Sequence, residues 1–357
     1  MKTSQQFFAQ LPVAYPIIQA PMAGVATPAL AAAVSNGGAL GSLGIGAGTA
    51  AQARRMIEET RALTGKPINV NVFCHAPAQR DAARETAWLD HLAPLFLEFG
   101  AALPTVLEEI YRSFNDDDDS FRMLLDLRPE VVSLHFGLPS RDKIAALSHA
   151  GIRTMATATN LEEALLIEQA GVDAIVAQGI EAGGHRGMFE PAAPDERLSM
   201  AVLVRLLVKR TNLPVIAAGG IMDGAGVKAA LDLGAAGVQL GTAFILCPES
   251  AAGDAYRQNL QNERAGSTAL TAALSGRPAR GLVNRLIRHG ASGGVRPADY
   301  PVAYDAAKQL HAAAAKAGNH EFAAHWAGQG APLARAMPAA ELVRLLMREA
   351  QAAGGAA

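Results

Sequence analysis

The stretch AAGGIMDGAGVKAALDLGAAGVQLGTAF, residues 217–244, decides the fold class. It contains the end of an apolar strand, the pair Gly219-Gly220, a short helical pattern and a second apolar strand that ends at Gly241-Thr242. Strands that alternate with helices in this way indicate βαβ units and a parallel sheet. Glycines at both strand ends let backbone N–H groups approach a phosphate closely, and Thr242 adds a hydroxyl. The stretch therefore predicts a parallel sheet that binds a phosphate group at the carboxyl ends of two strands.

The same alternation extends back to the beginning of the chain. Eight β units within the first 249 residues match a (β/α)8 TIM barrel, which typically has about 250 residues. A doubly wound sheet is the alternative that strand counting alone leaves open. In the helical pattern after the fifth strand, Asn160 is the expected N-cap. The predicted strands are PIIQAP (16–21), ALGSLG (39–44), PINVNVF (67–73), VVSLHFG (131–137), IRTMATA (152–158), DAIVAQG (173–179), PVIAAGG (214–220) and GVQLGTAF (237–244).

Two segments do not fit the repeat. Residues 75–125 have a helical pattern with an acidic run at 116–119, and residues 250–357 are alanine-rich and helical in pattern. Both follow strands, on the face where TIM-barrel active sites lie. We therefore expect a barrel of residues 1–74 and 126–249, and a smaller, mainly helical cap of residues 75–125 and 250–357. The acidic run is expected to be a solvated loop.

Composition excludes several classes of protein. The 357 residues carry a formal net charge of -2, which argues against a nucleic-acid partner. The two cysteines, Cys74 and Cys247, lie far apart and outside any metal-binding spacing, so no metal is expected. The start MKTSQQFFAQLP is unlike a signal peptide, and no apolar run is long enough to span a membrane. We expect a cytoplasmic protein, of an oligomeric state that the sequence leaves open.

A second glycine-rich motif, AQGIEAGGHRG (177–187), follows the sixth predicted strand. Gly183 and Gly184 have no side chains, so their backbone can come close to a planar ligand. His185 follows at once. A histidine in a glycine loop at the active face is a candidate for a functional role.

Other strand ends also place polar groups at the barrel mouth. Asn69 and Asn71 are two residues apart in the third strand, so both point to the same face. A flavin pyrimidine ring offers matching donors and acceptors, while a structural hydrogen-bond role is the competing interpretation. Gln178 and His135 end the sixth and fourth strands, and for both a place in the pocket and a packing role stay open. In QAPMAGVATPAL (19–30), the residues expected at the mouth are Ala20, Pro21 and Met22.

With these motifs the chain resembles the nitronate monooxygenase family, formerly called 2-nitropropane dioxygenases. The resemblance runs from about residue 15 to the C-terminus, with APM, NVN, EAGGHRG and AAGGI…LGAAGVQLGTAF in the same order. EAGGH also occurs in FMN-dependent enoyl-ACP reductases, and the last block is similar in several FMN barrels and in IMP dehydrogenase. The segments LPTVLEEIYRSF, YPVAYDAAKQL and HWAGQG add discrimination, because they resemble the cap of the class I enzymes.

The resemblance implies that FMN is bound non-covalently. It also implies that O₂ oxidises alkyl nitronates, including propionate 3-nitronate, to a carbonyl compound and nitrite or nitrate. His185 is implied as the catalytic residue next to the flavin, either as a base on neutral nitroalkanes or as a hydrogen-bond donor to the nitro oxygens. We favour the donor role, because a nitronate has already lost its proton. The residues expected to bind the cofactor are Ala20, Pro21, Met22, Asn71, Gln178, Gly183, Gly184, Gly219, Gly220, Gly241 and Thr242.

The cap segments supply the remaining expectations. If residues 300–308 are helical, Tyr300, Tyr304 and Lys308 project from one face and close over the substrate. Lys308 would then attract an anionic substrate or anchor the cap, whereas a surface row with Lys308 in water is the structural alternative. The residues expected at the substrate side are His135, Tyr111, Tyr256, Tyr300, Tyr304, Lys308 and Trp326.

Three rival functions remain open at this point. The first is an FMN-dependent NAD(P)H:quinone or enoyl reductase on the same barrel. The second is an IMP dehydrogenase-like enzyme, which needs a nucleophilic cysteine that neither Cys74 nor Cys247 supplies in a matching motif. The third is a binding protein without chemistry, which would leave a capped, glycine-lined barrel mouth unexplained.

Overall fold

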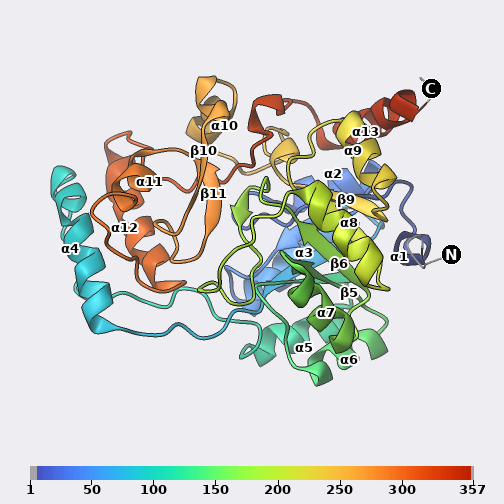
Figure 1. Cartoon of the computed structure of the whole chain (residues 1–357), viewed down its shortest axis with the longest axis horizontal. Helices are drawn as coiled ribbons and strands as arrows, with labels where there is room; N and C mark the ends of the chain where they lie inside the picture. The colour runs from blue at the N-terminus through green and yellow to red at the C-terminus, as the bar shows by residue number, and fades with distance from the viewer. Residues whose placement is uncertain (1–5, 355–357) are drawn as a thin grey trace.

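A closed ring of eight parallel strands forms the centre of the molecule (Figure 1). The computed structural model describes residues 6–354. Neighbouring strands are hydrogen-bonded in the order β1-β9-β8-β6-β5-β4-β3-β2. The ring closes because Gln19 N–H donates to Leu40 O at 3.0 Å and Leu40 N–H donates to Ile17 O at 2.9 Å. An open doubly wound sheet has two free edges, so this closure confirms the predicted TIM barrel. The strands are β1 (Ile17–Gln19), β2 (Gly41–Gly44), β3 (Ile68–Phe73), β4 (Val131–His135), β5 (Arg153–Ala158), β6 (Ala174–Gln178), β8 (Val215–Ala218) and β9 (Gly237–Leu240).

Helices surround the ring, and side chains at their first turns fix where they begin. The Asn160 side chain accepts from Glu163 N–H and caps α7, as predicted. Thr49 caps α3 and Asp223 caps α9 in the same way. The helices that follow the barrel strands are α2 (Pro28–Asn36), α3 (Ala50–Leu63), α5 (Asp118–Leu127), α6 (Arg141–His149), α7 (Leu161–Ala170), α8 (Met200–Arg210) and α9 (Gly224–Asp232), and α1 (Gln6–Ala9) precedes β1.

The barrel interior is layered. Its lower end is apolar and contains Ile18, Met155 and Ile216, with Phe7 of α1 packed against them. Above this layer Asn69 Nδ2 donates to the hydroxyls of Ser42 and Ser133, both at 3.0 Å. This polar layer is fully buried at Asn69, which therefore belongs to the barrel core. The open space begins only above it, at the carboxyl ends of the strands.

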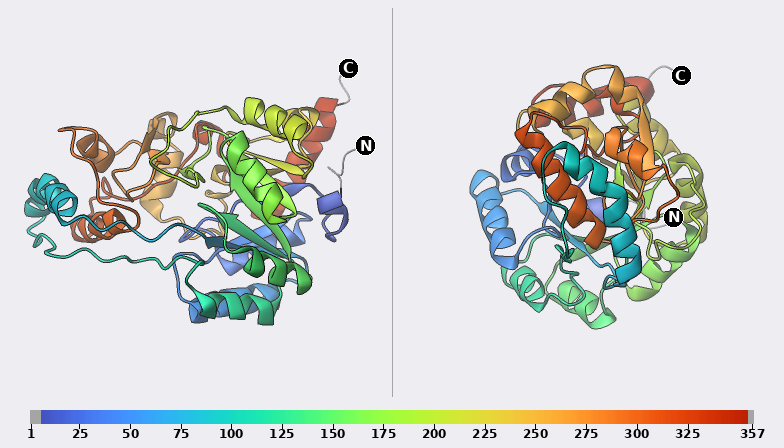
Figure 2. Two further views of the ribbon diagram at one scale, coloured as in Figure 1. Left: turned by 60° about the horizontal axis from the view of Figure 1, so that its bottom comes forward. Right: turned by 90° about the vertical axis from the view of Figure 1, so that its left-hand side faces the viewer.

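A second hydrophobic cluster lies over the mouth of the barrel. Trp88, Leu92 and Phe96 of α4 (Ala82–Glu98) pack with Val302 and Leu310 of α12 (Val302–Lys316). Figure 2 shows α4 and α12 side by side in front of the barrel ring when the molecule is seen from this end. The further elements beyond the barrel are α10 (Asp254–Leu260), α11 (Arg285–Gly290) and the 3-10 helices η1 (Thr242–Phe244), η2 (Glu263–Gly266) and η3 (Ala331–Leu333).

The segments that cover the mouth are shorter than the sequence suggested. Helix α13 (Ala339–Gly354) packs on α9 and α2, and its apolar stripe, including Leu342 and Leu346, belongs to the barrel core. Helix α5 packs on α3 and α6, and Asp117 of the acidic run caps it rather than lying in a loop. We therefore propose that the cap consists of residues 75–116 and 250–338, and that both helices belong to the barrel.

The cap is also less helical than expected. A three-stranded antiparallel sheet joins β10 (Thr268–Thr271), β11 (Ala279–Leu282) and β7 (Gly184–His185). The first two strands lie in the segment with a helical pattern, so that reading is wrong for residues 268–282. The third is part of the AQGIEAGGHRG motif, where a loop was expected. The sheet therefore attaches the cap directly to the glycine motif of the barrel.

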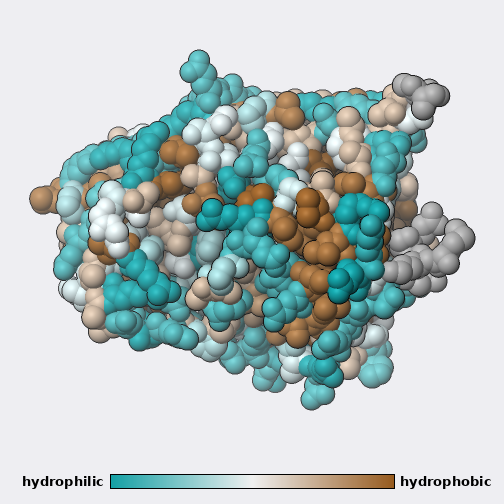
Figure 3. Space-filling model, viewed as in Figure 1, coloured by the Kyte–Doolittle hydropathy of each residue, from teal (hydrophilic) through white to brown (hydrophobic). Residues whose placement is uncertain are grey.

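One face of the outer surface carries an apolar patch. Figure 3 shows a mostly hydrophilic face with an apolar patch over the barrel half, in the region of α8. Val202 of α8 and Leu166 of α7 are exposed large apolar side chains. Scattered side chains of this kind are normal and imply no function. Within residues 6–354, no helix has both the length and the apolar character needed to cross a bilayer.

Candidate active site

One large cavity lies between the barrel mouth and the cap. Its volume is about 1260 Å³, whereas a pocket for one drug-sized ligand usually has about 300–1,000 Å³. The cavity therefore has room for a cofactor and a small substrate together. Every residue that the sequence predicted for the site lies on its wall: Ala20, Pro21, Met22, Asn71, Tyr111, His135, Gln178, Gly183, Gly184, His185, Gly219, Gly220, Gly241, Thr242, Tyr256, Tyr300, Tyr304, Lys308 and Trp326.

The ends of β8 and β9 form one end of the cavity. Gly219 and Gly220 have φ of 121° and 71°, which side-chain-bearing residues rarely adopt, so this turn requires glycine. At the neighbouring strand end, Thr242 Oγ1 accepts from Gly328 N–H at 3.0 Å. The hydroxyl proton of Thr242 is then still available to an anion in the cavity. This end has the small residues and the donor that a phosphate group needs.

The two positions before His185 require glycine for different reasons. A Cβ on Gly183 would lie 2.5 Å from Gly328 N, so Gly183 is required by the close approach of the chain at residues 326–330. At Gly184 nothing lies within 4 Å of such a Cβ, but φ is 76°. The expected approach of a ligand therefore does not explain Gly183. Gly183 allows the cap to cross the glycine motif tightly, and Gly184 supplies the positive φ of the turn before His185.

The amides of β3 and β6 lie on the floor of the cavity. Asn71 Nδ2 donates to Ser133 O at 3.1 Å and to Ser133 Oγ at 3.0 Å. Its Oδ1 has no partner among the described residues, so it can accept from an N–H group of a ligand. Gln178 Oε1 accepts from Gly187 N–H at 2.8 Å, which leaves Nε2 to donate to His185 O at 2.9 Å. Both amides are thus held in one orientation.

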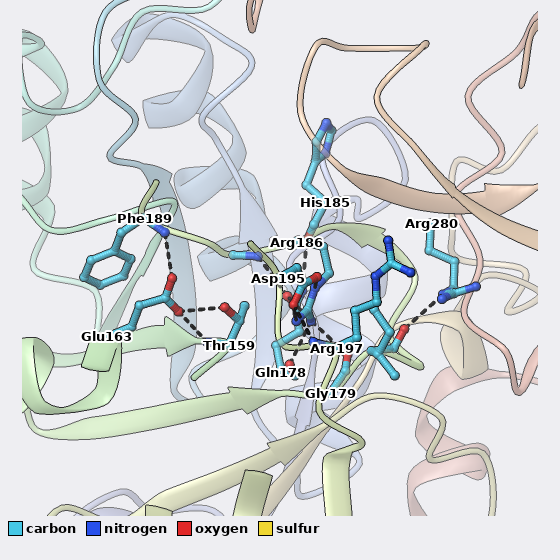
Figure 4. Close-up of polar contacts among 12 residues, drawn as sticks. Thr159, Glu163, Gln178, Gly179, His185, Arg186, Phe189, Asp195, Arg197 and Arg280 are labelled. Carbon is cyan, nitrogen blue, oxygen red and sulfur yellow. Dashed lines mark hydrogen bonds and ion pairs between the residues drawn. The ribbon is translucent and has the colours of Figure 1, made fainter. Parts of the chain in front are cut away.

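Arg186 holds this part of the floor in place (Figure 4). Only 1% of its surface is exposed, and its guanidinium makes two hydrogen bonds to Asp195, at 2.8 and 2.9 Å. The remaining donor, Nη1, reaches Gln178 O at 2.9 Å and Gly179 O at 3.1 Å. Sequence reasoning missed this residue, because a motif that also contains Gln178, Glu181 and His185 does not indicate which of its polar side chains is buried in an ion pair.

His185 is uncharged in this environment. It lies in β7, opposite Ala279 of β11, and its Nε2 is 2.8 Å from Ser275 Oγ. Burial, followed by the nearby His135 and Arg277, lowers the pKa of His185 to about 3. Ser275 lies on the cap and no sequence signal pointed to it. A neutral imidazole has one N–H and one lone pair, so the Ser275 hydroxyl determines which of them faces the cavity.

His135 supports His185 from behind. Its Nε2 contacts His185 O at 3.3 Å and its Nδ1 contacts Thr157 Oγ1 at 3.0 Å. Because a carbonyl only accepts, Nε2 carries the proton and Nδ1 accepts from the threonine hydroxyl. Burial lowers the pKa of His135 to about 4, so it too is neutral. The side chain lines the cavity, but both of its nitrogens are already engaged.

Aromatic rings form the roof above His185. The ring centres of Trp326, Tyr300 and Tyr304 lie 5.1, 5.7 and 6.2 Å from that of His185. Tyr300 precedes α12, so the expected helical row of three begins outside the helix, although all three members line the cavity. The buried Tyr300 hydroxyl has no partner among the described residues. Tyr256 differs, because its hydroxyl donates to Trp326 O and its ring stacks on His325 at 4.5 Å.

Lys308 lies at the outer end of the roof. Its Nζ is 4.8 Å from the ring centre of Tyr111 and 5.3 Å from that of Tyr304. Cation–π contacts of this kind attract an ammonium group to the faces of two rings. Partial burial lowers the pKa of Lys308 from its ordinary value. The residue lines the cavity but is also exposed to solvent, so it lies where the cavity meets the surface.

Comparison with known proteins agrees with this geometry. A family model described as nitronate monooxygenase matches residues 5–349. The chain belongs to the nitronate monooxygenase family. A nitronate monooxygenase of Pseudomonas aeruginosa is 58% identical over 347 residues, which cover 97% of this chain and 99% of that protein. A nitronate monooxygenase of Paraburkholderia phytofirmans is 60% identical over 335 residues, covering 94% and 92%.

Solved structures show how far the nitronate monooxygenase architecture extends. A nitroalkane oxidase from Streptomyces ansochromogenes superposes with a TM-score of 0.90 at 40% identity, covering 97% of this chain and 98% of that one. FabK from Thermotoga maritima superposes with a TM-score of 0.75 at 28% identity, covering 98% and 97%. Because both alignments span nearly whole chains, the region over the mouth is included in the likeness.

The buried ion pair of the floor gives a prediction about stability. Asp195→Asn leaves the Arg186 charge buried without its counter-charge, so the free energy of unfolding should fall by about 3–5 kcal/mol. Urea denaturation followed by circular dichroism measures this. As a control, Asp232→Asn breaks the exposed pair with Lys228 and should leave the midpoint almost unchanged. Equal small effects of both substitutions would contradict the role given to Arg186.

Proposed function

We propose that this chain is an FMN-dependent nitronate monooxygenase. It oxidises alkyl nitronates, such as propionate 3-nitronate, with O₂ to carbonyl compounds and nitrite or nitrate. One observation carries the proposal: an uncharged His185 lies between an amide-lined floor and an aromatic roof in a cavity large enough for a flavin and a substrate. Family membership supports the same conclusion. The partners are a small nitronate and O₂, without nucleic acid.

The residues present fit FMN. Gly219, Gly220 and Gly241 would surround the phosphate at the ends of β8 and β9, and Thr242 would donate to it. Asn71 Oδ1 is an acceptor without a partner in the described chain, as an N–H of the pyrimidine ring requires. Ala20, Pro21 and Met22 would cover the ring from the end of β1. When bound, FMN supplies the electron acceptor, so the chain itself needs no nucleophile.

The chain's own residues position the substrate and exclude water. A nitronate reaches the site already deprotonated, so no strong base is needed. The Ser275 hydroxyl lies 2.8 Å from His185 Nε2 and 3.2 Å from Arg277 O, and it has one proton to donate. When it donates to Nε2, the neutral His185 carries its own proton on Nδ1 and presents that N–H toward a nitro oxygen. The roof of Tyr300, Tyr304 and Trp326 covers this position. Low polarity there strengthens each hydrogen bond to an anion.

An FMN-dependent reductase is the second candidate. The likeness to FabK at 28% identity is the observation that favours a reductase. An enoyl reductase domain from Bacillus amyloliquefaciens, at 12% identity, shares the fold. The two functions differ in what reduces the flavin. Rapid bleaching of the flavin by NADH or NADPH under argon supports a reductase, whereas bleaching by a nitronate alone supports the proposed function.

The cofactor can be identified directly. Heat-denatured protein should release FMN, because the cavity has one glycine-lined phosphate end. The released flavin is identified by chromatography against FMN and FAD standards. FAD, or the absence of flavin after reconstitution, would sink this assignment.

Substitution of His185 tests its role at the reacting centre. His185→Asn should keep FMN bound and lower kcat/KM on ethyl nitronate by roughly 10²-fold or more, since a preorganised donor is lost. In the wild type, the pH profile of kcat/KM should show no ionisation of His185 between pH 5 and 9, because its pKa lies near 3. Flavin content measured by absorbance is the control. Unchanged kcat/KM in the variant would show that His185 is a bystander.

Lys308 is expected to select substrates that carry a second negative charge. Its ammonium group lies at the outer end of the cavity, so it can contact a carboxylate while the nitronate group lies below His185. Lys308→Met should lower kcat/KM on propionate 3-nitronate at least tenfold more than on propyl nitronate, which has no carboxylate. Equal losses on both substrates point to anchoring of the cap, and no loss on either removes Lys308 from the site.

A further inference from the structure

Arg277 is a buried cation that neither the motifs nor the site assignment includes. It lies in the turn between β10 and β11, and only 3% of its surface is exposed. Its Nη2 donates to Met188 O, and its guanidinium carbon lies 4.3 Å from the ring centre of Phe136 and 5.9 Å from that of Tyr300. The guanidinium is thus packed against two rings of the active-site wall.

The chain does not neutralise this charge. Arg186, which is equally buried, pairs with Asp195, whereas Arg277 takes part in no ion pair within residues 6–354, and its buried Nε has no hydrogen-bond partner there. The carboxylates that act on it electrostatically are engaged elsewhere. Glu163 accepts from Thr159 and Phe189, Glu190 accepts from Ala192 N–H, and Asp299 accepts from Gln79 N–H and Tyr300 N–H. An unpaired buried charge is costly for folding, so a site that retains one indicates a functional use.

Arg277 is connected to His185 in two ways. Ser275 Oγ accepts from Arg277 N–H at 3.3 Å and contacts His185 Nε2 at 2.8 Å. The rings of Phe136 and Tyr300, which contact the guanidinium, also lie 5.5 and 5.7 Å from the His185 ring. Phe136 has φ of 73°, a strained conformation for a bulky residue. Strain is thus accepted at the ring that separates Arg277 from His185.

The charge of Arg277 also acts on His185 electrostatically. Burial lowers the pKa of Arg277 to about 10, so the guanidinium still carries its charge at pH 7. It contributes to the lowered pKa of both His185 and His135. A permanent positive charge therefore lies directly behind the cavity wall, near two imidazoles that stay neutral. In a site of low polarity such a charge attracts an anion more strongly than it would in water.

We propose that Arg277 is the positioning residue that makes the cavity selective for anionic substrates: its charge, held behind Phe136 and Tyr300, stabilises the nitronate form next to His185. The substrate class is then set by a cation behind the wall and not by an ionised histidine. The inference rests on the proposed function for its substrate, but the anion preference can be measured without turnover.

The test compares three variants of the FMN-loaded protein. Arg277→Met removes the charge and retains much of the length, Arg277→Lys retains the charge, and Arg280→Met removes a buried arginine of the same hairpin that contacts Ile180 O and Thr268 Oγ1 instead. Nitrite is the anion probe, and its Kd is measured by isothermal titration calorimetry. We expect at least a tenfold weaker Kd and a tenfold higher KM for ethyl nitronate in Arg277→Met. Arg277→Lys should recover most of both, and Arg280→Met should stay within twofold of the wild type.

The outcomes separate the inference from the proposed function. Nitrite binding and KM that stay within twofold of the wild type in Arg277→Met would overturn the inference, as would equal losses in the Met and Lys variants, which would show a packing role. If the Met variant does not fold, Arg277→Gln retains a donor for Met188 O and is judged by the same criteria. The wild type could bind nitrite more tightly than Arg277→Met and yet fail to oxidise nitronates. That result would refute the proposed function and would still support the anion preference assigned to Arg277.

Discussion

The two hydrogen bonds that join β1 to Leu40 close the ring, and the site depends on this closure. In a closed parallel ring all strands end at one rim, so short segments far apart in the chain supply side chains to one space. Asn71, Gln178 and Thr242 come from β3, β6 and the end of β9, yet they line one cavity. The polar layer around Asn69 fills the barrel beneath them, so a ligand can approach only from the rim.

The cap covers this rim. Its hairpin pairs with β7, and Gly183 and Gly328 let the two backbones meet without side chains between them. Burial is then the largest cause of the lowered pKa of His185, His135 and His325. All three are neutral near pH 7, so they act through hydrogen bonds and packing. Among the buried arginines near the site, Arg186 is neutralised by Asp195 while Arg277 takes part in no ion pair within the described residues.

The sequence was sufficient where periodicity or backbone constraint carries the information. Each predicted barrel strand forms, and Gly219 and Gly220 take the positive φ that their turn requires. It was insufficient where a residue acts through a distant partner. Ser275, Arg186 and Arg277 have no local signature, because their roles depend on contacts 90, 9 and 89 residues away. Helix α13, which the sequence placed in the cap, packs on α9 and α2, and an amphipathic stripe does not reveal which surface it covers.

The chain resembles both a nitroalkane oxidase and FabK because the barrel rim and the cap contribute different parts of the site. The barrel rim offers a glycine-lined end and two oriented amides, which in the proposed function hold the flavin and would serve any flavin reaction. The chemistry must then be chosen by what faces the floor. Here that surface is an aromatic roof with an unpaired cation behind it. In the proposed function, the charge of this cation contributes more than the shape of the roof to disfavouring neutral, hydride-accepting substrates. A small anion loses water on entering this space and gains Tyr300, His185 and the field of Arg277 in return. A neutral molecule gains far less from the same charge, so discrimination arises from electrostatics without a dedicated acid or base.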